Sequence, residues 1–171
     1  MPTVVYAIGH STRTIDDFTE ILQAHSISIL ADIRTIPKSR HNPQFNAEEL
    51  KRALESKCIV YIHFPELGGL RKTRKDSVNT GWQNASFRGF ADYMQTREFA
   101  SAIRKLMQLA KQGQAAIMCA EGNPFRCHRS LVADALTVRR VRVLHISSRT
   151  SAREHTLTKF AKVSGTKITY P

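Results

Sequence analysis

The segment from Ala115 to Leu136 reads Ala-Ala-Ile-Met-Cys-Ala-Glu-Gly-Asn-Pro-Phe-Arg-Cys-His-Arg-Ser-Leu-Val-Ala-Asp-Ala-Leu, and it decides the fold class. Residues 115–118 form an apolar run typical of a buried strand, and residues 130–136 have the apolar spacing of a helix. A polar loop joins the two. Loops of this kind lie at the edge where open α/β sheets bind ligands, so the segment predicts both a fold and a site.

Further strands and helices alternate on either side of this segment. Short β-branched or apolar runs predict strands at 4–8, 27–31, 58–63 and 141–146. Helices are expected from a Thr14 cap to about residue 25, from an Asn46 cap to Leu54, and from a start near Cys127. Residues 87–111 suit one long helix, or two helices joined near Thr96.

This order of elements predicts an α/β fold, a single three-layer domain with a mostly parallel sheet of about five strands flanked by helices. We expect one domain over residues 1–171, with a core at about 4–146 and a C-terminal extension at 147–171. The extension has a weak helical pattern at 154–163 and a possible strand at 167–170.

The chain is strongly basic, with 26 Lys and Arg against 14 Asp and Glu and a formal net charge of +12. Such a charge favours a nucleic acid or a nucleotide as partner, although a basic surface that binds nothing is the alternative. The sequence shows no apolar run long enough to span a membrane and no signal segment, so we expect a cytoplasmic protein. Three cysteines without an export signal predict reduced thiols.

Several ionisable residues directly follow predicted strands. They are His10, Asp32 with Arg34, His63 with Glu66, and Cys119 with Glu121. Because the carboxyl ends of parallel strands meet at one edge of a sheet, we expect these residues to converge there. For each residue alone, a structural role such as helix capping is the alternative.

Cys127 has surroundings that favour a thiolate. It lies near a predicted helix start, and its neighbours are Arg126, His128 and Arg129. It is a candidate nucleophile or redox thiol, and a small buried packing residue is the alternative. Cys119, at the end of an apolar strand, is expected to be buried and inert.

Two other interpretations of this loop are weaker. Zinc bound by Cys119, Cys127 and His128 would need a fourth ligand, for example His10 or His63. A thiol-phosphatase loop has five residues between its cysteine and its arginine. Six residues lie between Cys119 and Arg126, so that spacing fails. An anion site at the helix start, with Arg126 and Arg129 as ligands, remains.

The loop from Arg34 to Asn46 is rich in cationic and amide side chains and is stiffened by prolines. Arg34, Lys38, Arg40 and Asn42 are its candidate anion ligands. Phe45 could stack on a base, but packing beside the following helix is the preferred interpretation. A second basic segment at 71–75 predicts an exposed loop, with or without a role in phosphate contact, and Trp82 could cover either a ligand or the core.

Taken together, several motifs resemble the bacterial and archaeal family called domain of unknown function 488. The motifs are Ile8-Gly-His-Ser-Thr12, Asp32-Ile-Arg34 with Pro37, Ser39-Arg40 and Phe45-Asn46, Pro65-Glu-Leu-Gly-Gly69, and Met118-Cys-Ala-Glu121 through Pro124 to Cys127-His-Arg129. The resemblance covers about residues 5–146. It implies a compact α/β domain but no activity.

Three functions are compatible with these patterns. The first is a cytoplasmic enzyme acting on a phosphate-bearing substrate, a nucleic acid or a nucleotide. The second is a nucleic-acid-binding protein without catalysis, and the third is a thiol redox or metal-binding protein. For the enzyme, the candidate catalytic residues are His10, Glu66, Cys119, Glu121, Cys127 and His128, and the candidate anion ligands are Arg34, Lys38, Arg40, Asn42, Arg126 and Arg129. The sequence specifies no cofactor.

Overall fold

A six-stranded sheet in the order β3-β2-β4-β1-β5-β6 forms the centre of the computed structural model, which describes residues 3–171. Five strands are parallel: β1 (Val4–Gly9), β2 (Ile29–Asp32), β3 (Val60–His63), β4 (Ala115–Cys119) and β5 (Arg142–Ser148). The sixth, β6 (Ser151–Glu154), pairs antiparallel with β5. The sequence-based prediction of a mostly parallel sheet is confirmed, with one strand more than expected.

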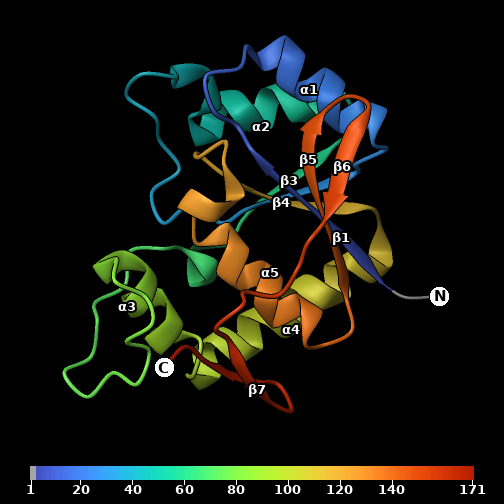
Figure 1. The fold of residues 1–171 in the computed structure, drawn as a ribbon. Coiled ribbons are helices and arrows are strands. Elements are labelled where there is room, and N and C mark those ends of the chain that lie inside the picture. The colour runs from blue at the N-terminus through green and yellow to red at the C-terminus, as the bar shows by residue number, and fades with distance from the viewer. Residues whose placement is uncertain (1–2) are drawn as a thin grey trace.

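Helices cover both faces of the sheet (Figure 1). Helices α1 (Ile15–Ala24) and α2 (Ala47–Glu55) lie on one face, and α4 (Arg97–Gln112) and α5 (Arg129–Thr137) lie on the other, with α3 (Ala85–Tyr93) next to them. Each face has its own buried apolar cluster, one containing Phe18 and Leu50 and the other Phe99 and Leu131. The predicted three-layer α/β architecture is therefore present.

Side-chain caps explain where several helices begin. Thr14 Oγ1 accepts a hydrogen bond from the Asp17 amide at 3.1 Å, and Thr96 Oγ1 accepts one from the Phe99 amide at 3.3 Å. The second cap starts α4 after α3 has ended, so residues 87–111 form two helices. Asn46 stands at the start of α2, but its side chain accepts from the Ser39 amide at 2.7 Å and stabilises the preceding loop.

The C-terminal extension corrects one prediction. The weak helical pattern at 154–163 is not a helix, because these residues run from the end of β6 to β7 (Lys162–Ser164), which pairs with β8 (Lys167–Thr169). The predicted terminal strand is confirmed. Asp134 on α5 holds the extension, since its buried carboxylate accepts from His155, Thr158 and Tyr170 at 2.7 to 3.1 Å.

The segment at 71–75 is exposed in part only. The Arg71 guanidinium lies 3.7 Å over the Tyr93 ring and donates to the Gly68 and Pro65 carbonyls, so this arginine is fixed. Trp82 packs against Phe87, Phe160 and Tyr170, and it therefore covers the core. Within residues 3–171, no helix has the length and apolar character needed to cross a membrane.

Candidate functional site

A cavity of about 350 Å³ lies at the carboxyl edge of the sheet, beside the end of β4. It is formed by segments that the sequence keeps far apart: the loop after β2, the loop after β3, the start of α3, and the loop between β4 and α5. Parallel strands bring such loops together. Its lining residues are Arg34, Thr35, Ile36, Lys38, Gly69, Leu70, Ser86, Phe87, Cys119, Ala120, Glu121, Arg126, Cys127 and His128.

Cys119 and Cys127 meet in this cavity. Cys119 ends β4, and the chain returns through the short 3₁₀ helix η3 (Pro124–Arg126) to place Cys127 beside it, with the two sulfur atoms in direct contact. The expectation that Cys119 is an isolated, inert thiol is therefore wrong, because it faces Cys127. The spacing of the two residues did not reveal the reversal of the chain that pairs them. Both side chains are buried, and Cys58 is an exposed free cysteine.

Arg129 places a positive charge against this pair. Its side chain is 1% exposed, and Nη1 donates to Cys119 Sγ and to the Glu121 carbonyl, both at 2.8 Å, while Nη2 donates to the Gly122 carbonyl. Burial lowers the pKa of Arg129 to about 10, which still leaves it charged at neutral pH. No carboxylate in residues 3–171 forms an ion pair with it. A Cys119 thiolate would supply the missing negative charge.

His128 faces the second sulfur. Its Nε2 lies 2.9 Å from the Ile33 carbonyl oxygen, which can only accept, so Nε2 carries the proton. Burial lowers the pKa of His128 to about 4, so the ring is neutral at pH 7 and Nδ1 has a free lone pair. Nδ1 lies 3.5 Å from Cys127 Sγ. The backbone amide of Arg129 also approaches this sulfur, at 3.4 Å. Cys127 thus has one acceptor and one donor within reach.

Arg34 contributes an unused donor to the cavity. Asp32 holds it through Nε at 2.9 Å and Nη2 at 2.7 Å, and Nη2 also donates to the Phe45 carbonyl. The remaining nitrogen, Nη1, is buried and has no hydrogen-bond partner among the described residues, although the side chain is only 6% exposed. A buried guanidinium nitrogen without an acceptor is costly, and an oxygen of a bound anion would satisfy it.

The mouth of the cavity is cationic and partly apolar. Lys38 and Arg126 are exposed on its rim, as are Ile36 and Leu70, whose exposed fractions are 59% and 69%. Glu121 is the one carboxylate among the lining residues. The rim therefore suits a molecule with an anionic group and an apolar part.

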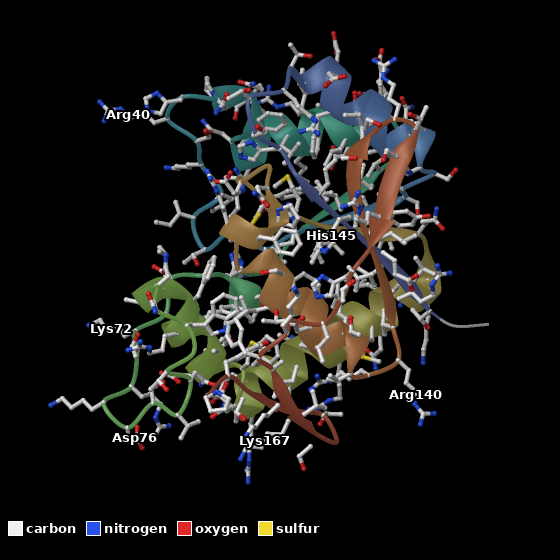
Figure 2. The ribbon with its side chains drawn as sticks, viewed as in Figure 1. Arg40, Lys72, Asp76, Arg140, His145 and Lys167 are labelled. Atoms are coloured by element: carbon white, nitrogen blue, oxygen red, sulfur yellow. A yellow bond between two sulfur atoms is a disulfide. The ribbon has the colours of Figure 1, made fainter. Side chains whose placement is uncertain are left out.

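Five predicted site residues do not line the cavity: Arg129, which contacts Cys119 as described above, and four others. His10 is buried and stacks on Phe45 at 4.3 Å, and burial lowers its pKa. Glu66 is exposed, and its backbone carbonyl, not its carboxylate, accepts from Tyr93 at 2.6 Å. Arg40 extends away from the fold (Figure 2), because its loop turns outward before η1 (Pro43–Phe45). Asn42 lies in the same loop, where its backbone N–H donates to Ser39 Oγ at 3.0 Å.

Sequence reasoning missed a buried network behind Arg129. His145 Nε2 and His155 Nδ1 are 2.8 Å apart, and His155 Nε2 lies 2.8 Å from Asp134 Oδ1. His145 is near the centre of the view in Figure 2. The alternation of β5 gave no sign of this contact, because His155 reaches it from the other side of the β5-β6 turn.

No group of three or more His, Cys, Asp or Glu side chains in residues 3–171 is arranged to hold a metal ion. The described side chains therefore do not complete a zinc site around Cys119, Cys127 and His128.

These features define an α/β protein with a paired-cysteine site at the carboxyl edge of its sheet. A family model described as "Domain of unknown function DUF488" matches residues 14–136, which is more than half of the chain. The chain belongs to this family. Searches of curated proteins and of solved structures gave no match.

Proposed function

We propose that the protein is a thiol–disulfide oxidoreductase whose reactive group is the pair Cys119 and Cys127. The observation that carries this proposal is the contact of the two sulfur atoms in a cavity, beside a buried guanidinium that has no carboxylate partner. A purely structural disulfide does not need a positive charge beside it. In a pair that alternates between disulfide and thiols, the charge stabilises the thiolate of the reduced state.

The two cysteines have different roles in this proposal. Cys127, next to His128 Nδ1 and the Arg129 amide, is the sulfur that exchanges with the substrate. Cys119, against the Arg129 guanidinium, is the partner that leaves as a thiolate and later closes the disulfide again. A stabilised thiolate is the better leaving group in thiol–disulfide exchange.

The exchange takes place in two balanced steps. A substrate thiolate attacks Cys127 Sγ, the Cys119–Cys127 bond breaks, and Cys119 leaves with the electron pair as a thiolate. A second substrate thiolate then attacks the substrate sulfur of the mixed disulfide and releases Cys127 as a thiolate. Two substrate thiols have then lost two electrons to the pair, and a disulfide of another molecule returns the pair to its oxidised form by the reverse steps.

The substrate carries an anionic group in this proposal. Arg34 Nη1 is a buried donor without a partner in the described chain, and Lys38 and Arg126 add positive charge at the rim. A phosphate-bearing thiol or disulfide suits this set, and it retains the phosphate recognition that the loop sequences predict.

A redox titration tests the proposal. The Cys58→Ser protein, which keeps only the cavity cysteines, is equilibrated in glutathione buffers, and free thiols are alkylated and counted by mass spectrometry. We expect a reversible two-electron transition at a potential above about −270 mV, in the range of catalytic pairs. A pair that stays oxidised in the folded protein below about −300 mV, as structural disulfides do, would contradict the proposal.

The second candidate function is chemistry on a phosphate-bearing substrate without a redox change, and the unpartnered Arg34 Nη1 favours it too. A panel of nucleotides and oligonucleotides separates the two functions. Turnover that survives in a folded Cys127→Ser variant would support this second function over the redox function.

A further inference from the structure

A second cavity, of about 450 Å³, lies on the other side of Arg129, between the loop before η3 and the hairpin of β5 and β6. The cavity that Cys119 and Cys127 line shares no lining residue with this second cavity. Its lining includes Pro124, Phe125, Arg129, His145, Arg153 and Glu154. None of its histidines was singled out by the sequence motifs.

Two buried polar atoms on its lining residues lack partners. Arg129 Nε and His145 Nδ1 are both inaccessible to solvent, and neither has a hydrogen-bond partner in the part of the chain that the structure describes. Arg129 itself is 1% exposed. Buried polar groups without partners are rare and costly, so a ligand or an ordered water that reaches these two atoms would be stabilised there.

The network behind His145 fixes what each atom requires. Asp134 also accepts from Thr158 and Tyr170, so its carboxylate takes the proton of His155 Nε2. With both rings neutral, His155 Nδ1 accepts the proton of His145 Nε2, which leaves a lone pair on His145 Nδ1. His145 Nδ1 therefore needs a donor, and Arg129 Nε, which always carries a proton, needs an acceptor.

The charges around the cavity favour an anion. Arg129 and Arg153 are its cationic lining residues, and the single lining carboxylate, Glu154, is paired with Arg142 at 3.0 Å. The negative charge of Asp134 lies behind His155. At neutral pH, carboxylates and sulfate have lost their protons, whereas a phosphate group with its second ionisation near pH 6 still exposes a P–OH in part of the population.

We propose that this second cavity binds a protonated phosphate monoester, whose P–OH donates to His145 Nδ1 and whose anionic oxygen accepts from Arg129 Nε. The cavity is larger than a phosphate group needs, and the organic part of the ligand lies against Pro124 and Phe125, the latter 71% exposed. The binding does not depend on the redox function of the cysteine pair.

Calorimetric titration with phenyl phosphate and with phenyl sulfate, at pH 6.5 and constant ionic strength, tests the proposal directly. The monoanion of phenyl phosphate has the same charge as phenyl sulfate and differs from it by the P–OH proton, whereas the phenyl phosphate dianion carries one more negative charge. We expect phenyl phosphate to bind at least tenfold more tightly than phenyl sulfate, because the sulfate leaves His145 Nδ1 without a donor. Equal affinities would overturn the proposal, and so would the absence of any binding, which would mean that water alone occupies the cavity.

Two variants locate the binding. His145→Phe keeps a ring of similar shape but has no nitrogen, and we expect it to weaken phenyl phosphate binding at least tenfold. Arg104→Gln, an exposed arginine on α4 that lines neither cavity, is the matched control and should leave the affinity within twofold. An unchanged affinity in a folded His145→Phe protein would overturn the proposal. If His145→Phe does not fold, Arg153→Gln, which changes an exposed residue of the second cavity, takes its place with an expected loss of at least threefold.

Discussion

Replacing Arg129 with methionine should make the Cys119–Cys127 disulfide harder to reduce. Methionine fills much of the space of the arginine stem but removes the guanidinium that donates to Cys119 Sγ at 2.8 Å. A hydrogen bond to a charged group contributes about 1.5 to 3 kcal/mol net, and here it acts mainly in the reduced protein, where Cys119 is a thiolate. Since about 30 mV corresponds to about 1.4 kcal/mol for a two-electron couple, the potential should fall by about 30 to 65 mV.

The assay is the glutathione titration in the Cys58→Ser background, with folding followed by denaturant unfolding. Folding needs this check because Arg129 also holds the carbonyls of Glu121 and Gly122. Arg129→Lys keeps the charge but loses the planar guanidinium with its several N–H donors. The reduction potential of the cysteine pair in this variant should therefore lie between those of the parent protein and the Arg129→Met protein. Arg104→Met, an exposed arginine on α4, is the control and should leave the potential unchanged. A folded Arg129→Met protein with an unchanged or higher potential would refute this role of the charge.

Three further predictions concern the surroundings of the site. Gly69→Ala should slow the exchange at Cys127 at least tenfold, because its Cβ would lie 2.7 Å from His128 Nδ1 and displace that ring. Stopped-flow kinetics with an aromatic disulfide measure this rate. Stability should fall as the pH drops from about 6.5 to about 4, by about 3 kcal/mol from His128, because the unfolded chain takes up the proton in this window and the folded chain does not. Urea unfolding at several pH values, compared with His128→Asn, measures this, and an equal slope in both proteins would rule out His128 as the cause. Asp134→Ala should cost about 3 to 5 kcal/mol in denaturant unfolding, because donors such as the Tyr170 hydroxyl lose a buried charged acceptor; a cost below 1 kcal/mol would contradict this.

Local patterns in the sequence were sufficient to predict most of the fold. Strand runs, caps such as Thr14 and Thr96, and the alternation of strands and helices identified the parallel sheet and its order along the chain. The prediction failed at 154–163, where contacts distant in sequence decide the structure. Asp134 binds His155 and Thr158 across the domain, and β6 pairs with the edge of β5, so a weak helical pattern did not decide the conformation.

The candidate site was predicted in part. The convergence of the strand ends was a sound expectation for Arg34, Cys119 and Glu121, which line one cavity together with Cys127 and His128. The sequence could not show which way each loop turns, and Arg40 and Glu66 lie outside that cavity. It also could not show that Cys119, taken as inert, contacts the sulfur of Cys127.

Trapping of a mixed disulfide tests the central claim most directly. In a Cys58→Ser, Cys119→Ser protein, Cys127 can attack an aromatic disulfide but has no partner to release the product. The reagent is 5,5′-dithiobis(2-nitrobenzoate), and the redox account predicts a stable adduct on Cys127 in the folded protein, identified by peptide mass spectrometry. The adduct should form at least tenfold faster than in the same protein with the additional changes Lys38→Gln and Arg126→Gln. If Cys127 reacts only after the protein is unfolded, the account is wrong.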